Sequence, residues 1–226
     1  MAQYKSGAIF VTLMVESKNM SFSKYILTFI LFIVIAMCGF AQETVAPPAQ
    51  IAWMTWEEAI DRQKIDRDNY NKDKKANPAP KKIFLDIYTG WCGWCKKMDK
   101  TTFKNPEVIR YMNKYFYAIK LDAEMTETIS HNGHDFINPR PELVRGRRGT
   151  HQLAASLLDN RLSYPSYVIM DENTNRLVIY KGYKQTDAFV GILSFFGTNQ
   201  YLSYKQTLSQ QSKGTQQQVA APKTDK

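Results

Sequence analysis

Residues 83–100 read "IFLDIYTGWCGWCKKMDK", and this stretch decides how the chain folds. The apolar run IFLDIY predicts a buried strand over residues 82–88. Cys92 and Cys95 follow it in a C-x-x-C spacing, where a helix that continues to Lys100 is expected to begin. A pair of cysteines at this spacing can bind a metal ion, close a small loop, or cycle between dithiol and disulfide.

The position of Cys92 favours redox chemistry. At the start of a helix, unpaired backbone N–H groups and the helix dipole stabilise an anion, so the pKa of the thiol is expected to fall. Lys96 and Lys97 add positive charge nearby. Cys95 lies one turn deeper on the same side of the helix, where its sulfur can form a disulfide with Cys92 or release a mixed disulfide.

The residues between and around the cysteines suit a substrate site. Gly93 gives the turn conformational freedom, and Trp91 and Trp94 supply flat apolar surface for a partner chain. Asp86 stands within the apolar strand, and burial there would raise the pKa of its carboxyl group. A buried acid could hold or accept the proton of the deeper thiol. The alternative is that Asp86 pairs with a nearby lysine or lies at a strand edge.

The segment "FLDIYTGWCGWCK" resembles the active-site strand, turn and helix of the thioredoxin superfamily. In that family an aspartate stands six residues before the first cysteine, as Asp86 does here, and Trp91 and Lys96 match the family's flanking residues. The family also carries a cis-proline opposite the disulfide, and "SYPSYVIMD" supplies Pro165 in that place. The resemblance implies that Pro165 positions the substrate and that the backbone of Tyr164 pairs with it.

The resemblance covers residues 52–204 and implies an α/β, thioredoxin-like fold: a mixed central β-sheet flanked by helices, with an N-terminal helical extension. Two features depart from the family pattern. Trp94 replaces a frequent proline between the cysteines, and an insertion at about residues 123–163 precedes the cis-proline and is placed to shape partner choice. Capping signals and apolar periodicity predict further helices at 56–67, 106–116, 150–160 and 187–197, a strand at 117–124, and a hairpin of strands 166–171 and 176–182.

The ends of the chain have a different composition. Residues 1–41, with a possible true start at Met20, resemble a secretory signal peptide: a lysine, an apolar run, then small residues. Residues 42–51 are expected to be a linker and residues 205–226 a disordered tail. These features predict a periplasmic or otherwise exported protein. Retention of the apolar segment as a membrane anchor and lipid attachment at Cys38 remain open alternatives.

The function indicated is an exported thiol–disulfide oxidoreductase that needs no bound cofactor. Its expected partners are protein dithiol or disulfide substrates and a redox partner protein, with no nucleic acid, because the formal charge of +9 is scattered rather than clustered. The membrane would be a partner only through an uncleaved N-terminal segment.

Two other functions stay open. One is a binding or chaperone-like module of the same fold without turnover. The other is a Cys₂His₂ zinc site in which His131 and His134 join the two cysteines. His151, near the start of the helix at 150–160, is expected to be a polar surface residue.

Overall fold

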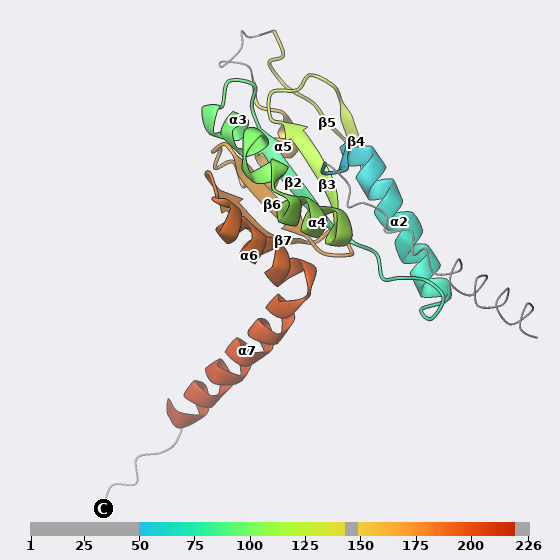
Figure 1. Cartoon of the computed structure of the whole chain (residues 1–226), viewed down its shortest axis with the longest axis vertical. Coiled ribbons are helices and arrows are strands. Elements are labelled where there is room, and N and C mark those ends of the chain that lie inside the picture. Colours follow the sequence, from blue (N-terminus) through green and yellow to red (C-terminus); the bar gives the residue numbers. More distant parts are fainter. Residues whose placement is uncertain (1–49, 143–148, 220–226) are drawn as a thin grey trace, which may run out of the picture. The chain divides into compact units, whose positions relative to one another are not determined.

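The computed structural model describes residues 50–142 and 149–219, which form a five-stranded mixed sheet flanked by helices (Figure 1). The strands are β1 (Trp53–Met54), β2 (Lys82–Tyr88), β3 (Phe116–Asp122), β6 (Ser166–Met170) and β7 (Arg176–Lys181), with a separate hairpin of β4 (Ile129–His131) and β5 (His134–Phe136). The helices are α2 (Trp56–Lys72), α3 (Gly93–Lys100), a 3₁₀ turn η1 (Thr102–Lys104), α4 (Pro106–Tyr115), α5 (Gln152–Leu157), α6 (Thr186–Gly197) and α7 (Gln200–Val219).

The strand order is β1-β3-β2-β6-β7. The three strands β1, β3 and β2 run parallel, whereas β6 is antiparallel to β2 and β7 is antiparallel to β6. This is the α/β arrangement and the thioredoxin-like fold expected from the sequence. The predicted signal peptide, residues 1–41, and most of the linker lie outside the described residues.

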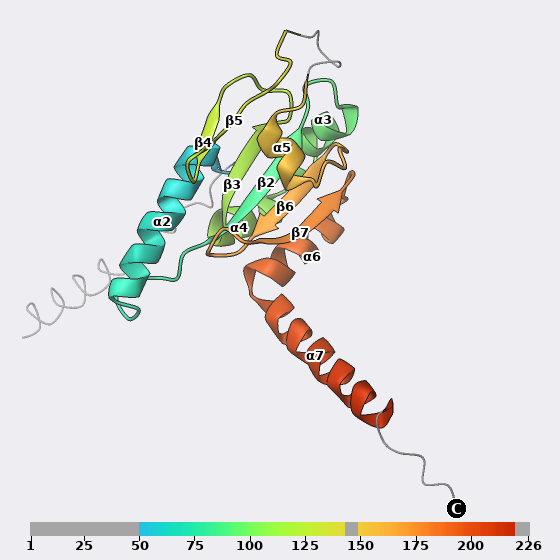
Figure 2. The ribbon, with the colours of Figure 1, turned by 180° about the vertical axis from the view of Figure 1, so that it is seen from behind.

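Strand β2 is the centre of the molecule because both of its faces are buried. Ile83, Leu85 and Ile87 pack with α2, α5 and β4 on one face. Phe84 packs with α3, α4 and α6 on the other. The view from behind shows α5 in front of the sheet (Figure 2). A continuous apolar run is what a strand buried on both faces requires.

Local signals in the sequence account for the helix starts. Thr55 and Glu58 form the predicted capping box of α2, which continues to Lys72 rather than ending near residue 67. Asn105 caps α4 and Pro106 occupies its first turn, as predicted. Helix α6 is an exception: it begins at Thr186, and its N-cap residue Gln185 makes no side-chain capping hydrogen bond.

The insertion contains more regular structure than its sequence indicates. Residues 129–136 form the β4–β5 hairpin, so His131 and His134 belong to strands rather than to a loop. His151 is 0% exposed, which corrects the expectation of a surface residue. Its side chain caps α5 by accepting a hydrogen bond from the Leu153 N–H, and its Nε2 lies 3.0 Å from the Glu127 carbonyl.

The C-terminal part also differs from expectation. Residues 205–219, predicted to be disordered from their polar composition, continue helix α7. In α6 the buried residues are Phe189, Leu193 and Phe196. Within residues 50–142 and 149–219, no helix combines the length and hydrophobicity needed to cross a bilayer.

Candidate redox site

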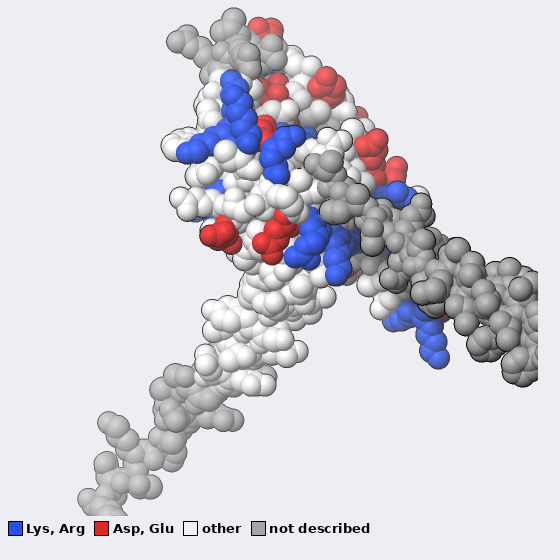
Figure 3. All heavy atoms as spheres, in the orientation of Figure 1, with Lys and Arg blue, Asp and Glu red and all other residues white. Residues whose placement is uncertain are grey.

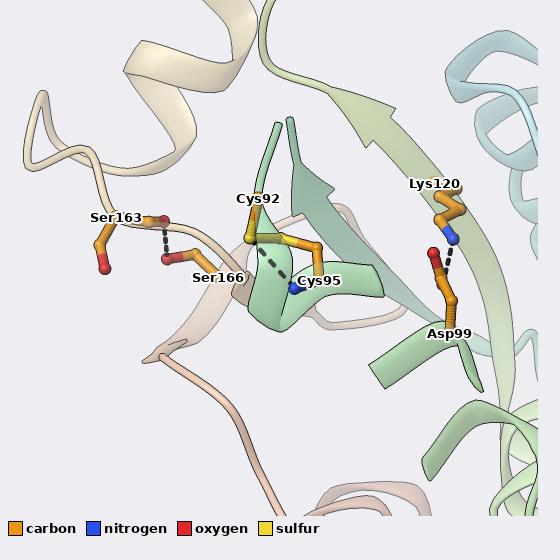
Figure 4. Close-up of a disulfide and its surroundings, with 6 residues drawn as sticks. All are labelled: Cys92, Cys95, Asp99, Lys120, Ser163 and Ser166. Atoms are coloured by element: carbon orange, nitrogen blue, oxygen red, sulfur yellow. Dashed lines mark hydrogen bonds and ion pairs between the residues drawn. A yellow bond between two sulfur atoms is a disulfide. The ribbon is translucent and has the colours of Figure 1, made fainter. Parts of the chain in front are cut away.

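The two cysteines lie at the N-terminus of α3, directly after β2. Cys92 is the N-cap residue, and its Sγ accepts a hydrogen bond from the Cys95 N–H at 3.1 Å. The two sulfurs form a disulfide (Figure 4). Cys92 is 5% exposed and Cys95 is 3% exposed, so the disulfide is largely sheltered. A sulfur that accepts a backbone N–H at a helix start is placed where a thiolate would be stabilised.

Asp86 lies in the middle of β2 and is 2% exposed. Its Oδ1 has no hydrogen-bond partner among the described residues. Burial raises the pKa of this carboxyl to about 7; the charge of Lys120 opposes the rise and that of Asp99 adds to it. The structure therefore gives Asp86 the buried environment expected of it, rather than a direct ion pair or a strand edge.

The sequence did not single out Lys120 and Asp99. Lys120 is in register with Asp86 on the neighbouring strand β3, but its ammonium forms an ion pair with Asp99 of α3 (Figure 4). A lysine within the otherwise apolar strand of residues 116–121 was the only sequence signal for this pair. Its consequence is that Lys120, whose positive charge acts on Asp86, is already held by a second carboxylate.

Tyr167 is a further buried polar residue of the site. It pairs in register with Asp86 from β6, and its hydroxyl has no hydrogen-bond partner among the described residues. Burial, with the charge of Asp86 as the next contribution, raises the pKa of Tyr167. The hydroxyl therefore stays protonated.

Pro165 directly precedes strand β6. The Tyr164–Pro165 peptide bond is cis. The Pro165 carbonyl accepts a hydrogen bond from the Gly182 N–H at 2.8 Å, and Ser166 Oγ donates to the Ser163 carbonyl at 2.6 Å. Figure 4 shows the Ser163–Ser166 segment beside the disulfide.

Two exposed tryptophans flank the cysteines. Trp91 is 48% exposed and packs edge-to-face on Tyr164, with ring centroids 6.0 Å apart. Its Nε1 donates a hydrogen bond to Glu124 Oε1 at 2.9 Å, a contact that the sequence did not indicate. Trp94 is 56% exposed and packs on Tyr183 at 5.4 Å between centroids.

Lys97 and Gly93 complete the surroundings of the disulfide. The Lys97 ammonium lies over the rings of both Trp94 and Tyr183, at 5.1 and 4.9 Å from their centroids. Gly93 is the first residue of α3, and no heavy atom lies within 4 Å of where a Cβ would stand. The structure thus shows no steric need for glycine there.

A zinc site is not formed by the predicted ligands. Among the residues that the structure describes, no three histidines, cysteines, aspartates or glutamates lie close enough together to hold a metal ion. His131 instead packs edge-to-face on Trp56, with centroids 5.2 Å apart. The cysteine sulfurs are bonded to each other, so they are not metal ligands in this state.

Comparisons with known proteins find similarity to part of the chain. Residues 46–136 match the model of a family described as "Thioredox_DsbH: Protein of unknown function, DUF255". Uncharacterized protein B0495.5 of Caenorhabditis elegans is 39% identical over 51 residues, which is 23% of this chain and 7% of that protein. Spermatogenesis-associated protein 20 of Mus musculus is 34% identical over 58 residues, 26% of this chain and 7% of that protein. The chain therefore spans less than a tenth of these two relatives.

Two solved structures are similar to about two thirds of the chain. The structure titled "DsbH Oxidoreductase" has a TM-score of 0.42 and 16% identity, covering 69% of this chain and 90% of its own. A putative disulphide-isomerase from Bacteroides thetaiotaomicron has a TM-score of 0.42 and 19% identity, covering 66% and 95%. The family match spans β1 to β5, which includes the cysteine helix and the buried aspartate.

Proposed function

We propose that this chain is an exported thiol–disulfide oxidoreductase that exchanges disulfides with protein substrates. One observation carries the proposal: the Cys92–Cys95 disulfide stands at the N-terminus of α3, while Asp86 is buried in the preceding strand and its Oδ1 has no hydrogen-bond partner in the part of the chain that the structure describes. A structural staple is a poor alternative, because a disulfide that closes so short a loop removes little entropy from the unfolded chain.

In the reducing direction, the Cys92 thiolate attacks one sulfur of a substrate disulfide. A bond forms between Cys92 and that sulfur, and the other substrate sulfur leaves as a thiolate. Cys95 then gives its proton to the Asp86 carboxylate and attacks the Cys92 sulfur. The intramolecular disulfide re-forms and the second substrate thiol is released. The substrate has gained two electrons, which a redox partner protein returns to the chain.

The oxidising direction uses the same steps in reverse, with a substrate thiolate attacking the Cys92–Cys95 disulfide. In both directions Pro165 and the backbone of Tyr164 position the substrate chain beside Cys92. Trp91 and Trp94 give it an apolar surface to rest on, since both are about half exposed beside the disulfide. No bound cofactor takes part.

The decisive experiment is a trapping assay with Cys95→Ser. This variant should accumulate mixed disulfides through Cys92 when it meets its substrates, because the resolving thiol is gone. Cys92→Ser serves as the control and should trap none. A titration of the wild type against glutathione should show one two-electron transition. Failure to trap any partner, with no transition in that titration, would contradict the proposal.

Export is part of the same proposal. We expect residues 1–41 to direct secretion and cleavage to leave Gln42 as the first residue of the mature chain. Mass spectrometry of the protein recovered from the periplasm of a Gram-negative host tests this. An intact N-terminus found in the membrane fraction would favour an uncleaved anchor, and an acylated Cys38 would favour a lipoprotein.

A binding module without turnover is the second candidate, and the exposure of Trp91 and Trp94 is the observation that favours it. The two functions differ in whether they require the Cys92 thiol. A binding module keeps its affinity for its partner in Cys92→Ser, whereas an oxidoreductase loses turnover.

A further inference from the structure

A cavity of about 810 Å³ opens at the carboxyl ends of the three parallel strands. Met54, Tyr88 and Asp122, the last residues of β1, β2 and β3, all line it. The cysteine helix leaves the sheet at the same end, because it follows β2. In open α/β sheets, ligands bind in the crevice outside the carboxyl ends of the strands. We name this cavity the carboxyl-end pocket. It is not lined by the cysteines, but it lies at the same end of the sheet as the disulfide.

The walls of the carboxyl-end pocket are aromatic and acidic. Its carboxylates are Glu57, Glu58, Asp122, Glu124 and Glu127. Its one basic residue is Lys120, whose ammonium is paired with Asp99. Within the described part of the chain, none of the four glutamates forms an ion pair with a lysine or arginine. The pocket is therefore electronegative and attracts a cation.

The space-filling view shows that acidic and basic side chains lie on different sides of this part of the molecule (Figure 3). Acidic side chains gather on the side of β4, β5 and the start of α2. Basic side chains gather over α3 instead (Figure 3).

The aromatic walls already hold one cation. The Lys120 ammonium lies 5.2 Å from the ring centroid of Tyr88 and 5.5 Å from that of Trp53. Ring faces of this kind attract lysine and arginine side chains. Trp56, which also lines the pocket, is 4% exposed, and its indole N–H has no acceptor among the described residues. A buried donor without a partner is costly, so this wall of the pocket contains an unsatisfied polar group.

Glu124 connects the carboxyl-end pocket to the redox site. It lines the pocket, and its Oε1 accepts the hydrogen bond from Trp91, the residue before Cys92. A substrate chain that rests on Trp91 therefore passes along the rim of the pocket. We infer that the carboxyl-end pocket binds a lysine or arginine side chain of the protein substrate, a few residues from its reactive cysteine. This inference rests on the proposed function and adds a substrate preference to it.

The test uses the mature wild-type chain, reduced beforehand to the dithiol form, and synthetic peptides that contain one mixed disulfide. Lysine, glutamine or glutamate is placed in turn at each of the four positions on either side of the cysteine. We expect lysine to raise the second-order rate constant of exchange in a single turnover about fivefold or more over glutamate at one or two adjacent positions, because two or more carboxylates then face one ammonium. The preference should weaken at 0.5 M salt, where the screening length shortens.

A pair of variants tests whether the pocket is responsible. Glu57→Gln with Glu127→Gln should reduce the lysine-to-glutamate ratio to about twofold or less at the preferred position. The matched control, Asp68→Asn with Glu107→Gln, removes two exposed acidic charges that do not line the pocket and should keep the ratio.

The outcomes separate the inference from the proposed function. Equal rates for all peptides, or a preference that is the same at every position and in both double variants, would overturn the inference and leave the oxidoreductase standing. If no peptide exchanges, the oxidoreductase fails, and tryptophan fluorescence with a cysteine-free lysine peptide decides the pocket alone. Saturable binding that the Glu57→Gln, Glu127→Gln variant weakens would support the pocket, and absence of binding would overturn it.

Discussion

Asp86 is an ionisable group in a place that favours its neutral form. Burial opposes its ionisation, and the one lysine in register with it is held by Asp99. The result is a carboxyl whose pKa is raised to about 7. A group with this pKa can both hold and release a proton near neutral pH, which is what the resolving step of the proposed reaction needs.

Because the pKa of buried Asp86 is raised, its ionisation at high pH lowers the stability of the fold. In the unfolded chain an aspartate ionises near pH 4, so between about pH 4 and pH 7 only the folded state keeps the proton. The stability of the wild type should therefore fall as pH rises through this window. We expect oxidised Asp86→Asn to exceed the wild type by roughly 3–4 kcal/mol in the free energy of unfolding at pH 8.

Urea unfolding from pH 4 to pH 8 measures this difference, which should shrink toward pH 4. Exposed Asp68→Asn is the control and should follow the wild type at every pH. A constant gap between Asp86→Asn and the wild type would show that burial of the charge is not the cause.

Replacing either member of the Lys120–Asp99 pair should shift the pKa of Asp86, and the two shifts should have opposite directions. Asp99→Asn removes a negative charge and frees Lys120, so the pKa of Asp86 should fall below about 7. Lys120→Met removes the opposing positive charge, so the pKa should rise above about 7. Carbon-13 NMR titration of the Asp86 carboxyl measures both. Shifts in the same direction in both variants would contradict the arrangement.

At the scale of elements, helix α6 contains two glycines with opposite roles. A Cβ on Gly197 would lie 2.9 Å from the Cβ and Cγ of Tyr115, so this glycine permits α4 and α6 to approach. A Cβ on Gly191 would meet no heavy atom within 4 Å. We expect Gly197→Ala to destabilise the fold by about 1–3 kcal/mol. Gly191→Ala should stabilise it by about 0.5–1 kcal/mol, because alanine favours the helix. Urea unfolding of both variants decides, and equal effects would refute the role of Gly197.

Helix α5 depends on a neutral histidine. Nδ1 of His151 accepts the Leu153 N–H, and burial lowers the pKa of the imidazole. The folded state therefore resists a proton that the unfolded chain takes up near pH 6.5, so stability should fall as pH drops below that value.

His151→Asn keeps a capping acceptor without a titrating group, and it should lose this part of the acid sensitivity. Unfolding by urea at pH 7.5 and pH 5 compares it with the wild type. Exposed His134→Gln is the control and should stay as acid-sensitive as the wild type. Unchanged acid sensitivity in His151→Asn would remove His151 from the explanation.

Features that depend on neighbouring residues could be predicted from the sequence, whereas contacts between distant residues could not. The capping box at Thr55, the buried strand and the cysteine helix follow from neighbouring residues, and all were predictable. The contacts Glu124–Trp91 and Lys120–Asp99 join residues 33 and 21 positions apart. These contacts form only once the strands have their order in the sheet, and a local sequence pattern does not predict that order. His151 was misjudged for the same reason, because its burial comes from the insertion packing on the sheet.

At the scale of the whole molecule, the two faces of the sheet have separate cores joined through β2. The candidate redox site lies where the parallel strands end, since the cysteine helix, Trp91 and the carboxyl-end pocket are all at that end. The opposite end of β2 has a structural role. Lys82, at the start of the strand, is 3% exposed and contacts Glu172, Asn199 and the ring of Tyr201.

Tyr201 connects α7 to the hydrophobic core that also contains Phe84 and Phe196. It is 7% exposed and stacks on Phe196 with centroids 5.4 Å apart, whereas residues 202–211 are exposed. Truncation after Lys205 should therefore change the free energy of unfolding by less than about 1 kcal/mol, since residues 206–211 are exposed. Tyr201→Ala should lower it by about 2–4 kcal/mol, because a buried aromatic ring is lost. Urea unfolding of the full chain, the truncated chain and Tyr201→Ala tests this. A truncation as damaging as Tyr201→Ala would mean that the later turns of α7 also support the fold.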